Sequence, residues 1–187
     1  MCAEFEQILA EHCAPALLGC KASSLVCGSV EQWPHLRACL RAYSPVLARC
    51  GVELLLLGSC RGRWRLLVCH KSTLEAALRS PAAVSLLRSA GYPRDFTVAQ
   101  ALYRLRLRMV EEQEFPHEIG VFLGYPPADV QAFCRFGGAN CKLCGYWKVY
   151  GDVEHARSCF ARYDDCRECL CGGIGRGRTL AQLLAAA

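Results

Sequence analysis

The sequence has no apolar run near the roughly 18 residues that a membrane-spanning helix needs. The longest candidate covers only residues 52–58. The first residues also lack the Lys or Arg that opens a secretory signal, and Glu4 and Glu6 stand there instead. These absences exclude a spanning helix and predict a soluble, cytoplasmic protein with no membrane partner.

Charged residues are also few, at 21% of the 187 residues against 53% hydrophobic residues. This balance lies far from the low-hydrophobicity, high-charge composition of disordered chains, so most of the chain should fold. The sequence contains no internal repeat. We predict a single α+β domain over residues 1–171, followed by a flexible tail rich in Gly, Arg and Ala over residues 172–187.

Cysteine, in contrast, is abundant, with 15 residues. In a short secreted protein such a number indicates a disulfide framework, but this chain is long enough to bury a core of its own. We therefore expect most cysteines to be reduced and packed as small hydrophobic residues, with at least one free thiol because the count is odd. Reduced cysteine in this number would suit a host that lives with little oxygen.

A small sheet is predicted from two regions of the chain. Residues 52–58 and 63–70 are rich in strand-forming residues and are separated by a glycine-containing loop, which indicates a β-hairpin over 52–70. We expect the first of these strands to lie at the centre of the sheet and Leu55 to be fully buried. Residues 143–150 are predicted to form a further strand.

Helical spacing of apolar residues predicts several helices that pack with this sheet. The first covers residues 3–12, and because Pro15 disfavours helix at the residue before it, Cys13 should lie at an accessible bend or just before the first turn of the next helix. Asp152 is predicted to cap the last long helix. The other helices are predicted over residues 31–50, 72–80, 81–90, 97–109, 126–136 and 152–169. The segment 115–125 favours neither helix nor strand.

Three segments carry a resemblance to a known family. They are Glu11–Lys21 (EHCAPALLGCK), Phe115–Val130 (FPHEIGVFLGYPPADV), and Leu143–Val153 (LCGYWKVYGDV) with Tyr163–Arg167. Together they resemble an uncharacterised bacterial family of domains of unknown function, found mostly in anaerobes. The resemblance covers nearly the whole chain and implies a shared architecture without an assigned reaction.

The first candidate centre combines Cys13 with His117. Thiolate is the nucleophilic form of cysteine, and a histidine that the fold brings near is a common means of generating it. Cys-Ala-Pro-Ala-Leu also resembles the Cys-Gly-Pro-Ala-Leu of papain-like peptidases of the bacteriocin-processing type. That resemblance implies that Gln7 helps to hold an oxyanion and that Asn140 or Asp152 orients the histidine. The alternative is that Cys13 is a buried packing residue and His117 a capping or hydrogen-bonded one.

The C-terminal third holds a second candidate, a metal site. Cys141 and Cys144 form one C-x-x-C pair, and Cys166 and Cys169 form another. Two such pairs place four sulfurs on one zinc ion when each lies in a tight turn. Here Cys144 opens a predicted strand, and Cys166 and Cys169 share a helical pattern, so the alternative is a set of buried thiols without metal.

The net charge of +5 comes mainly from scattered arginines. Strand alternation places Arg61, Arg63 and Arg65 on one face, and Arg104 and Arg108 share a face of a predicted helix. No motif for DNA or RNA accompanies them, so a solvated outer face explains these charges as well as nucleic acid does.

The sequence therefore leads to two functional hypotheses. The first is a cysteine-dependent enzyme of acyl-transfer or amide chemistry, a hydrolase or transferase without a cofactor. It would act on a small-molecule or peptide substrate through Cys13 and His117. The second is a non-catalytic protein that binds zinc, another soft metal or a partner through its C-terminal cysteines. The sequence leaves the oligomeric state open.

Overall fold

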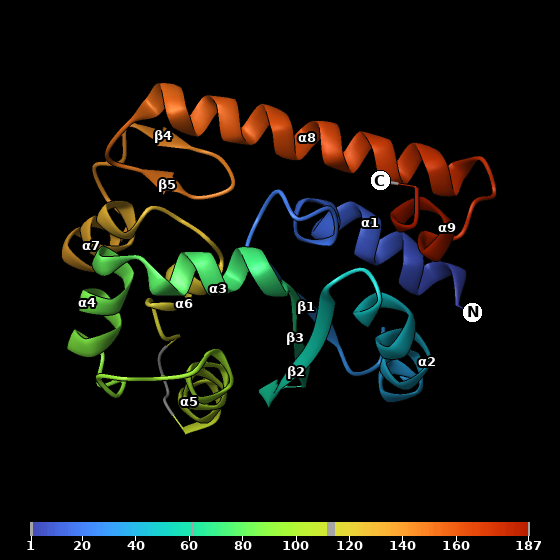
Figure 1. Ribbon diagram of the computed structural model, residues 1–187, viewed down its shortest axis with the longest axis horizontal. Helices are drawn as coiled ribbons and strands as arrows, with labels where there is room; N and C mark the ends of the chain where they lie inside the picture. The colour runs from blue at the N-terminus through green and yellow to red at the C-terminus, as the bar shows by residue number, and fades with distance from the viewer. Residues whose placement is uncertain (1, 61, 112–114, 187) are drawn as a thin grey trace.

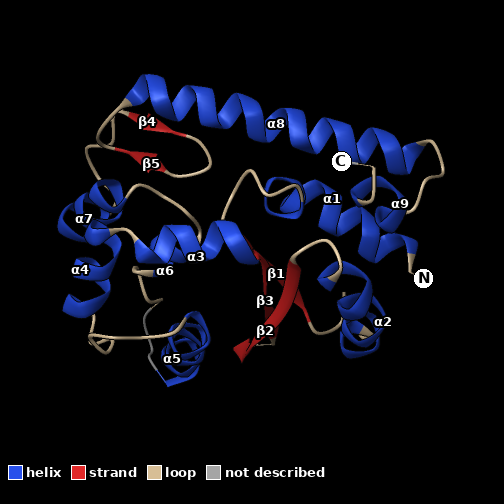
Figure 2. Cartoon of the chain, viewed as in Figure 1, coloured by secondary structure: helices blue, strands red, loops and turns tan. Residues whose placement is uncertain are grey.

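The computed structural model describes residues 2–60, 62–111 and 115–186 and has an α+β fold (Figure 1, Figure 2). Its strands are β1 (Ser23–Ser29), β2 (Val52–Cys60), β3 (Arg63–His70), β4 (Leu143–Cys144) and β5 (Lys148–Val149). Its helices are α1 (Ala3–Leu17), α2 (Leu36–Ala48), α3 (Lys71–Arg79), α4 (Pro81–Ser89), α5 (Val98–Glu111), α6 (Ile119–Phe122), α7 (Pro127–Phe136), α8 (Val153–Gly175) and α9 (Leu180–Leu184). The predicted fold class is confirmed. Within the described ranges, no helix is both long and apolar enough to span a bilayer.

The main sheet has three antiparallel strands in the order β1-β3-β2. β2 and β3 form the hairpin that was predicted over residues 52–70. The prediction that the first strand of this hairpin lies at the centre of the sheet is wrong. β1 pairs with the other edge of β3, starting from Ser23 opposite Cys69, and so makes β3 the central strand.

Helices cover both faces of this sheet, so side chains that alternate along each strand enter two different cores. On β3, Leu66 and Val68 pack with α1 and α2, whereas Leu67 and Cys69 pack with α3, α5 and α6. All four are buried. On β2, Leu55 is only half-buried, which corrects the expectation of full burial. The reason is its place in the sheet, because strands flank β3 on both edges but flank β2 on one.

The longest helix, α8, lies along α1, and α9 folds back against both of them (Figure 1). Leu180, Leu183 and Leu184 of α9 are buried in the core that α1 forms with the sheet. The Leu180 N–H donates to the buried Glu6 carboxylate at 2.9 Å. The predicted flexible tail, residues 172–187, is therefore helical and packed over most of its described length. Burial of three leucines outweighs the glycines that precede them.

The single strand predicted over residues 143–150 is instead a short hairpin, separate from the main sheet. β4 pairs with β5 in the register that sets Leu143 opposite Val149. The turn between them packs closely against α8, since a Cβ added at Gly145 would lie 2.2 Å from the Phe160 ring. Glycine is therefore required where the hairpin meets the long helix.

Helix α1 continues through Pro15 to Leu17, which corrects the prediction that it ends at residue 12. A proline inside a helix removes one backbone hydrogen bond. Here the stripe formed by Leu9, Cys13 and Leu17 is buried against the rest of the core, and this packing maintains the last helical turn. Cys13 consequently lies inside a helix and not at an accessible bend.

The predicted cap of the last long helix is confirmed. Asp152 caps α8 by accepting the His155 N–H at 3.0 Å. Ser80 caps α4, whose first residue is a proline. Helix α2 starts later than predicted, at Leu36 rather than residue 31. Pro34 accounts for the delay, because it disfavours helix at the residue before it.

Candidate ligand-binding cavity

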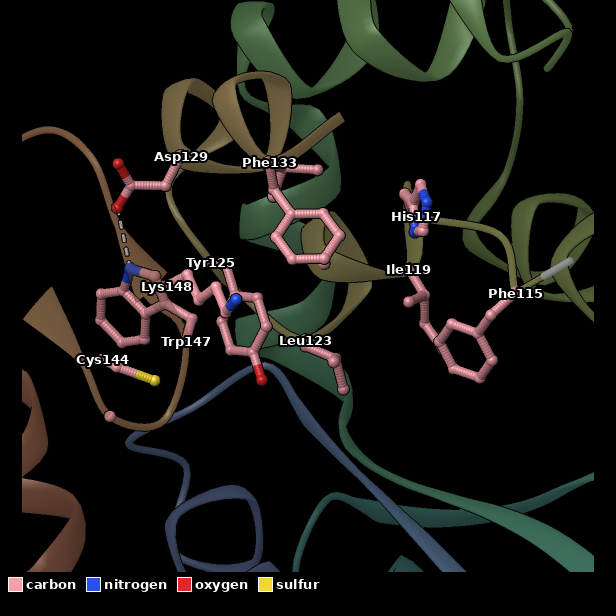
Figure 3. Close-up of a pocket in the computed structure, with 13 residues that line it drawn as sticks. Phe115, His117, Ile119, Leu123, Tyr125, Asp129, Phe133, Cys144, Trp147 and Lys148 are labelled. Atoms are coloured by element: carbon pink, nitrogen blue, oxygen red, sulfur yellow. Dashed lines mark hydrogen bonds between the residues drawn. The ribbon is translucent and has the colours of Figure 1, made fainter. Parts of the chain in front are cut away.

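A cavity of about 370 Å³ lies where α6, α7 and the β4–β5 hairpin meet (Figure 3). Its lining is mainly apolar and aromatic, and consists of Phe115, His117, Ile119, Gly120, Leu123, Tyr125, Asp129, Val130, Phe133, Cys144, Gly145, Trp147 and Lys148. All except Phe133 belong to two of the segments that carry the family resemblance. A cavity of this size and character is typical of a small-molecule site.

Asp129 of α7 fixes the hairpin against that helix. Its carboxylate is 4% exposed and accepts three hydrogen bonds. The donors are the Trp147 indole at 2.8 Å (dashed in Figure 3), the Tyr150 N–H at 3.0 Å and the Gly151 N–H at 2.8 Å. A buried carboxylate needs such donors to offset its lost hydration. Because the donors belong to the hairpin turn and to the two residues directly after β5, Asp129 positions Trp147 and holds the cavity wall in place.

Aromatic rings form the walls of the cavity. Tyr125 stacks on Trp147 with centroids 5.4 Å apart and planes at 28°. Trp147 in turn meets Phe160 of α8 edge-on at 4.6 Å. The His117 ring packs edge-on against Phe133 at 5.1 Å. These contacts restrict the rotamers of the rings, so the cavity presents preformed, flat apolar surfaces.

Glu118 anchors the start of α6, the one-turn helix in the segment for which the sequence favoured no structure. Its buried carboxylate lies 3.0 Å from Arg108 Nε and accepts the Tyr92 hydroxyl at 3.2 Å. Burial, reinforced by the charge of Glu118, raises the pKa of Tyr92, so the phenol remains a donor. This network fixes α6 while the neighbouring His117 stays exposed beside the cavity.

Two glycines explain why the segment 119–125 can pack so closely. A Cβ at Gly120 would lie 2.7 Å from Val130 Cγ2, so a side chain there would push α6 away from α7. Gly124 has a φ of 76°, the left-handed region that favours glycine, and lies directly against Ala22. The glycines therefore set the spacing between the helices that line the cavity.

Lys21 supports the Tyr125 wall from the connection between α1 and β1. Its side chain is buried, and its Nζ lies 5.2 Å from the centroid of the Tyr125 ring, which is a cation–π distance. Burial lowers the pKa of the amine to about 8, an effect that Cys13 opposes. Lys21 thus links the cavity to the core around α1.

The predicted Cys13–His117 centre is not assembled. Cys13 is 0% exposed within the core around α1, and burial raises the pKa of its thiol to about 12, against an opposing effect of Lys21. His117 is exposed and contacts Phe133. Within the described chain no interaction joins the two residues. A buried, neutral thiol is a poor nucleophile, so these features match the packing alternative.

The residues predicted to assist that centre make other contacts. Gln7 donates to Glu11 at 2.7 Å, one helical turn further along α1. Asn140 is exposed in the loop before β4 and has a φ of 59°. Asp152 caps α8, as described above. In the described residues none of the three contacts His117.

The four cysteines of the predicted zinc site are not gathered either. Cys166 is buried on α8, and burial together with a hydrogen bond to the Cys20 thiol raises its pKa to about 12. Cys144 lines the cavity, Cys169 is exposed on α8, and Cys141 is half-buried. Nowhere in the described chain do three or more His, Cys, Asp or Glu side chains form a group that could hold a metal ion. The two C-x-x-C pairs belong to separate elements, a hairpin and a helix.

The arginines considered for nucleic acid mostly hold elements together. Arg65 donates to a main-chain carbonyl of α5 at 2.7 Å, and Arg63 donates to one of β1 at 3.3 Å. Arg108 forms the ion pair with Glu118, and Arg104 is partly buried on the same helix. Arg61 lies outside the described residues. Arg63, Arg65 and Arg108 thus make contacts within the chain.

Sequence reasoning missed the residues that build the cavity, which are Tyr125, Asp129, Phe133 and Trp147. Aromatic residues at such positions are usually read as core, and a lone aspartate as surface. Their position in the sequence could have indicated the cavity. Three of the four lie in the segments of the family resemblance, where aromatic residues and glycines are concentrated.

No curated protein and no solved structure matches the chain. A protein family does match, over residues 9–184, a range that includes every residue of the cavity lining. The resemblance to an uncharacterised family is therefore confirmed. By this match the chain belongs to the family described as "Protein of unknown function (DUF3793)".

Proposed function

We propose that the protein binds a small, flat and largely apolar molecule in the cavity between α6, α7 and the β4–β5 hairpin. The observation that carries the proposal is a preformed, aromatic-walled space of about 370 Å³ that Asp129 holds in place through three hydrogen bonds. A structural core would close such a space, since protein interiors pack to a density that leaves few voids larger than a water molecule.

The lining determines the class of ligand. Apolar ring faces favour a ligand that removes apolar surface from water, and flat walls favour a planar one. Nitrogen donors among the lining side chains are few. Lys148 Nζ already donates to the Gly138 carbonyl at 2.6 Å, and the Trp147 indole donates to Asp129. His117 is therefore the side chain best placed to meet a polar or anionic group on the ligand.

The test is a titration with 1-anilinonaphthalene-8-sulfonate, a flat apolar dye with one anionic group. Cys144→Phe places a ring in the cavity, and Cys169→Phe adds the same bulk at an exposed site on α8 outside the lining. We expect the first variant to weaken dye binding at least about tenfold, a change of about 1.4 kcal/mol, and the second to leave it unchanged. Equal affinity in the two variants would refute the proposal.

A second readout locates the dye. Cys144 is exposed in the cavity lining, so a bound dye should slow its alkylation by N-ethylmaleimide, followed by mass spectrometry of the digested protein. Cys169 should alkylate at the same rate with and without dye. Slowing at both cysteines would indicate non-specific dye binding and would count against the cavity as the site.

A further inference from the structure

Strand β2 leaves one edge of the main sheet unpaired. In the order β1-β3-β2, its ladder partner within the described chain is β3. β2 runs from Val52 to Cys60 and contains the leucine run Leu54–Leu57. An edge strand offers a row of N–H and C=O groups to another chain, and proteins usually protect it with lysine, proline or a covering element. The leucine run contains no such residue.

The edge of β2 lies in a groove of about 890 Å³. Helices α2 and α5 form its walls, and β2 lies between them (Figure 1). The groove is more than twice the volume of the aromatic cavity and includes no residue of that cavity's lining. It is therefore a second, independent feature, of a size that suits a chain segment.

The floor of the groove consists of the β2 backbone and the side chains of its leucines. Leu55 and Leu56 are half-buried, so part of their apolar surface still contacts water, whereas Leu54 and Leu57 anchor the strand in the two cores. A strand added at this edge would gain main-chain hydrogen bonds, and its alternate side chains would cover the exposed parts of the leucines.

The groove is positively charged on both walls. Arg37 and Arg41 line it from α2, Arg106 lines it from α5, and Lys71 lines it at the start of α3. The acidic residues in the lining are Glu53 and Glu75, and Glu75 is paired with Arg79 at 2.6 Å. Four cationic side chains thus face two carboxylates, one of which is already neutralised.

We propose that the edge of β2 binds an acidic peptide segment in extended conformation, which adds a fourth strand to the sheet between α2 and α5. The positive charge of the groove favours an acidic peptide over a second copy of the chain. A second copy of this chain, paired β2 to β2, would bring two sets of arginines together, and like charges in an interface are unfavourable. Nucleic acid would meet the cations but would leave the strand edge and the leucines without complementary groups.

The experiment uses the full chain, immobilised and panned against a phage library of random ten-residue peptides. We expect the selected peptides to be rich in Asp and Glu that alternate with β-branched or aromatic residues. The best peptide is then synthesised with a fluorophore and its affinity measured by anisotropy. Arg41→Glu/Arg106→Glu reverses one exposed charge on each wall and should weaken binding at least about tenfold. Arg94→Glu/Arg157→Glu makes the same net charge change outside the groove and should leave affinity unchanged.

A peptide N-methylated at alternate residues separates strand addition from simple charge attraction, because methylation along one edge removes its main-chain donors. Two versions, one for each edge, should differ at least about tenfold in affinity. The proposal is overturned if selection shows no acidic enrichment, if the control and groove variants lose affinity equally, or if both methylated versions bind alike. It is also overturned if the groove variant abolishes self-association of the chain, or binding of a single-stranded oligonucleotide, instead of peptide binding.

Discussion

The region around Cys13 and the cavity beside Trp147 contrast sharply, although both are built by segments with a family resemblance. Cys13 has a reactive side chain but no space, because α1 and the residues packed on it leave it no exposed surface. The cavity has space but unreactive walls of Tyr125, Phe133 and Trp147. A residue type capable of chemistry therefore does not mark a site unless the fold also leaves room beside it.

The two regions also differ in how their buried polar groups are satisfied. Asp129 is buried, and donors from the β4–β5 hairpin and the two residues after it satisfy its carboxylate. The Cys13 thiol is also buried, and its loss of hydration is the largest influence on its pKa. A satisfied carboxylate fixes the geometry of its neighbours, whereas a thiol of this kind behaves as a small hydrophobic group.

Thiol reactivity should show the largest difference between the regions. Raising the pKa of Cys13 from 9.0 to about 12 lowers its thiolate fraction about a thousandfold at neutral pH, and burial adds to this. Iodoacetamide at about pH 7.5 should therefore label exposed Cys144 and Cys169 at least about a thousand times faster than Cys13, as measured by mass spectrometry of the digested protein. His117→Ala should not change the ratio.

The opposite result would restore the thiol hypothesis. Early labelling of Cys13, lost in His117→Ala, requires an opened state in which the two side chains meet. Uniform labelling of every cysteine would instead show that the core around α1 opens easily in solution.

The next largest effect is expected at Asp129. Asp129→Ala leaves the Trp147 indole and two backbone N–H groups without their acceptor, so we expect a loss of about 3–5 kcal/mol in the free energy of unfolding, measured in urea. Dye binding should be lost with it. The matched control is Asp152→Ala, which removes one exposed helix-capping bond and should cost about 1 kcal/mol. Similar costs for the two variants would mean that the hairpin does not depend on Asp129.

Local signals allowed the sequence to predict much of the fold. Ser80 before a proline and Asp152 before an amphipathic run satisfy backbone N–H groups within one turn, so the starts of α4 and α8 were predictable. The hairpin over residues 52–70 has its two strands joined by a short loop. In each case the stabilising contact lies within a few residues along the chain.

The features that the sequence did not predict depend on contacts between residues that are far apart along the chain. β1 contains three serines and a glycine and has little strand propensity, but pairing with β3 more than thirty residues away sets its structure. The tail follows a glycine-rich stretch, yet Leu180 bonds to Glu6 across 174 positions. The same holds for the cavity, because no local pattern links Asp129 to Trp147. Candidate residues chosen for reactive side chains therefore included His117 and Cys144 but omitted the walls.

The smallest effect is expected at Lys21. Its amine lies between the two regions, near Cys13 and over the Tyr125 ring. Burial lowers its pKa from 10.5 to about 8, so between these pH values the unfolded chain binds more protons than the folded one. Its contribution to the free energy of unfolding should therefore rise with pH from about 8 to 10.5 and be most unfavourable below 8. Cys13 acts in the opposite direction, because its raised pKa removes stability between about 9 and 12.

Comparison of Lys21→Met with the unchanged protein isolates the lysine below about pH 9, where Cys13 is protonated in both the folded and the unfolded chain. Below about pH 8 the variant should be more stable by up to about 3–4 kcal/mol, since each pKa unit corresponds to about 1.4 kcal/mol, and this advantage should disappear by about pH 10.5. Lys71→Met, at an exposed lysine, is the matched control substitution. If Lys21→Met is instead less stable at neutral pH, the contact with Tyr125 outweighs the cost of burying the amine. The cavity wall would then depend on a charged lysine, and dye binding by the unchanged protein should fall as the pH rises through 8, whereas the variant should bind weakly on both sides of pH 8.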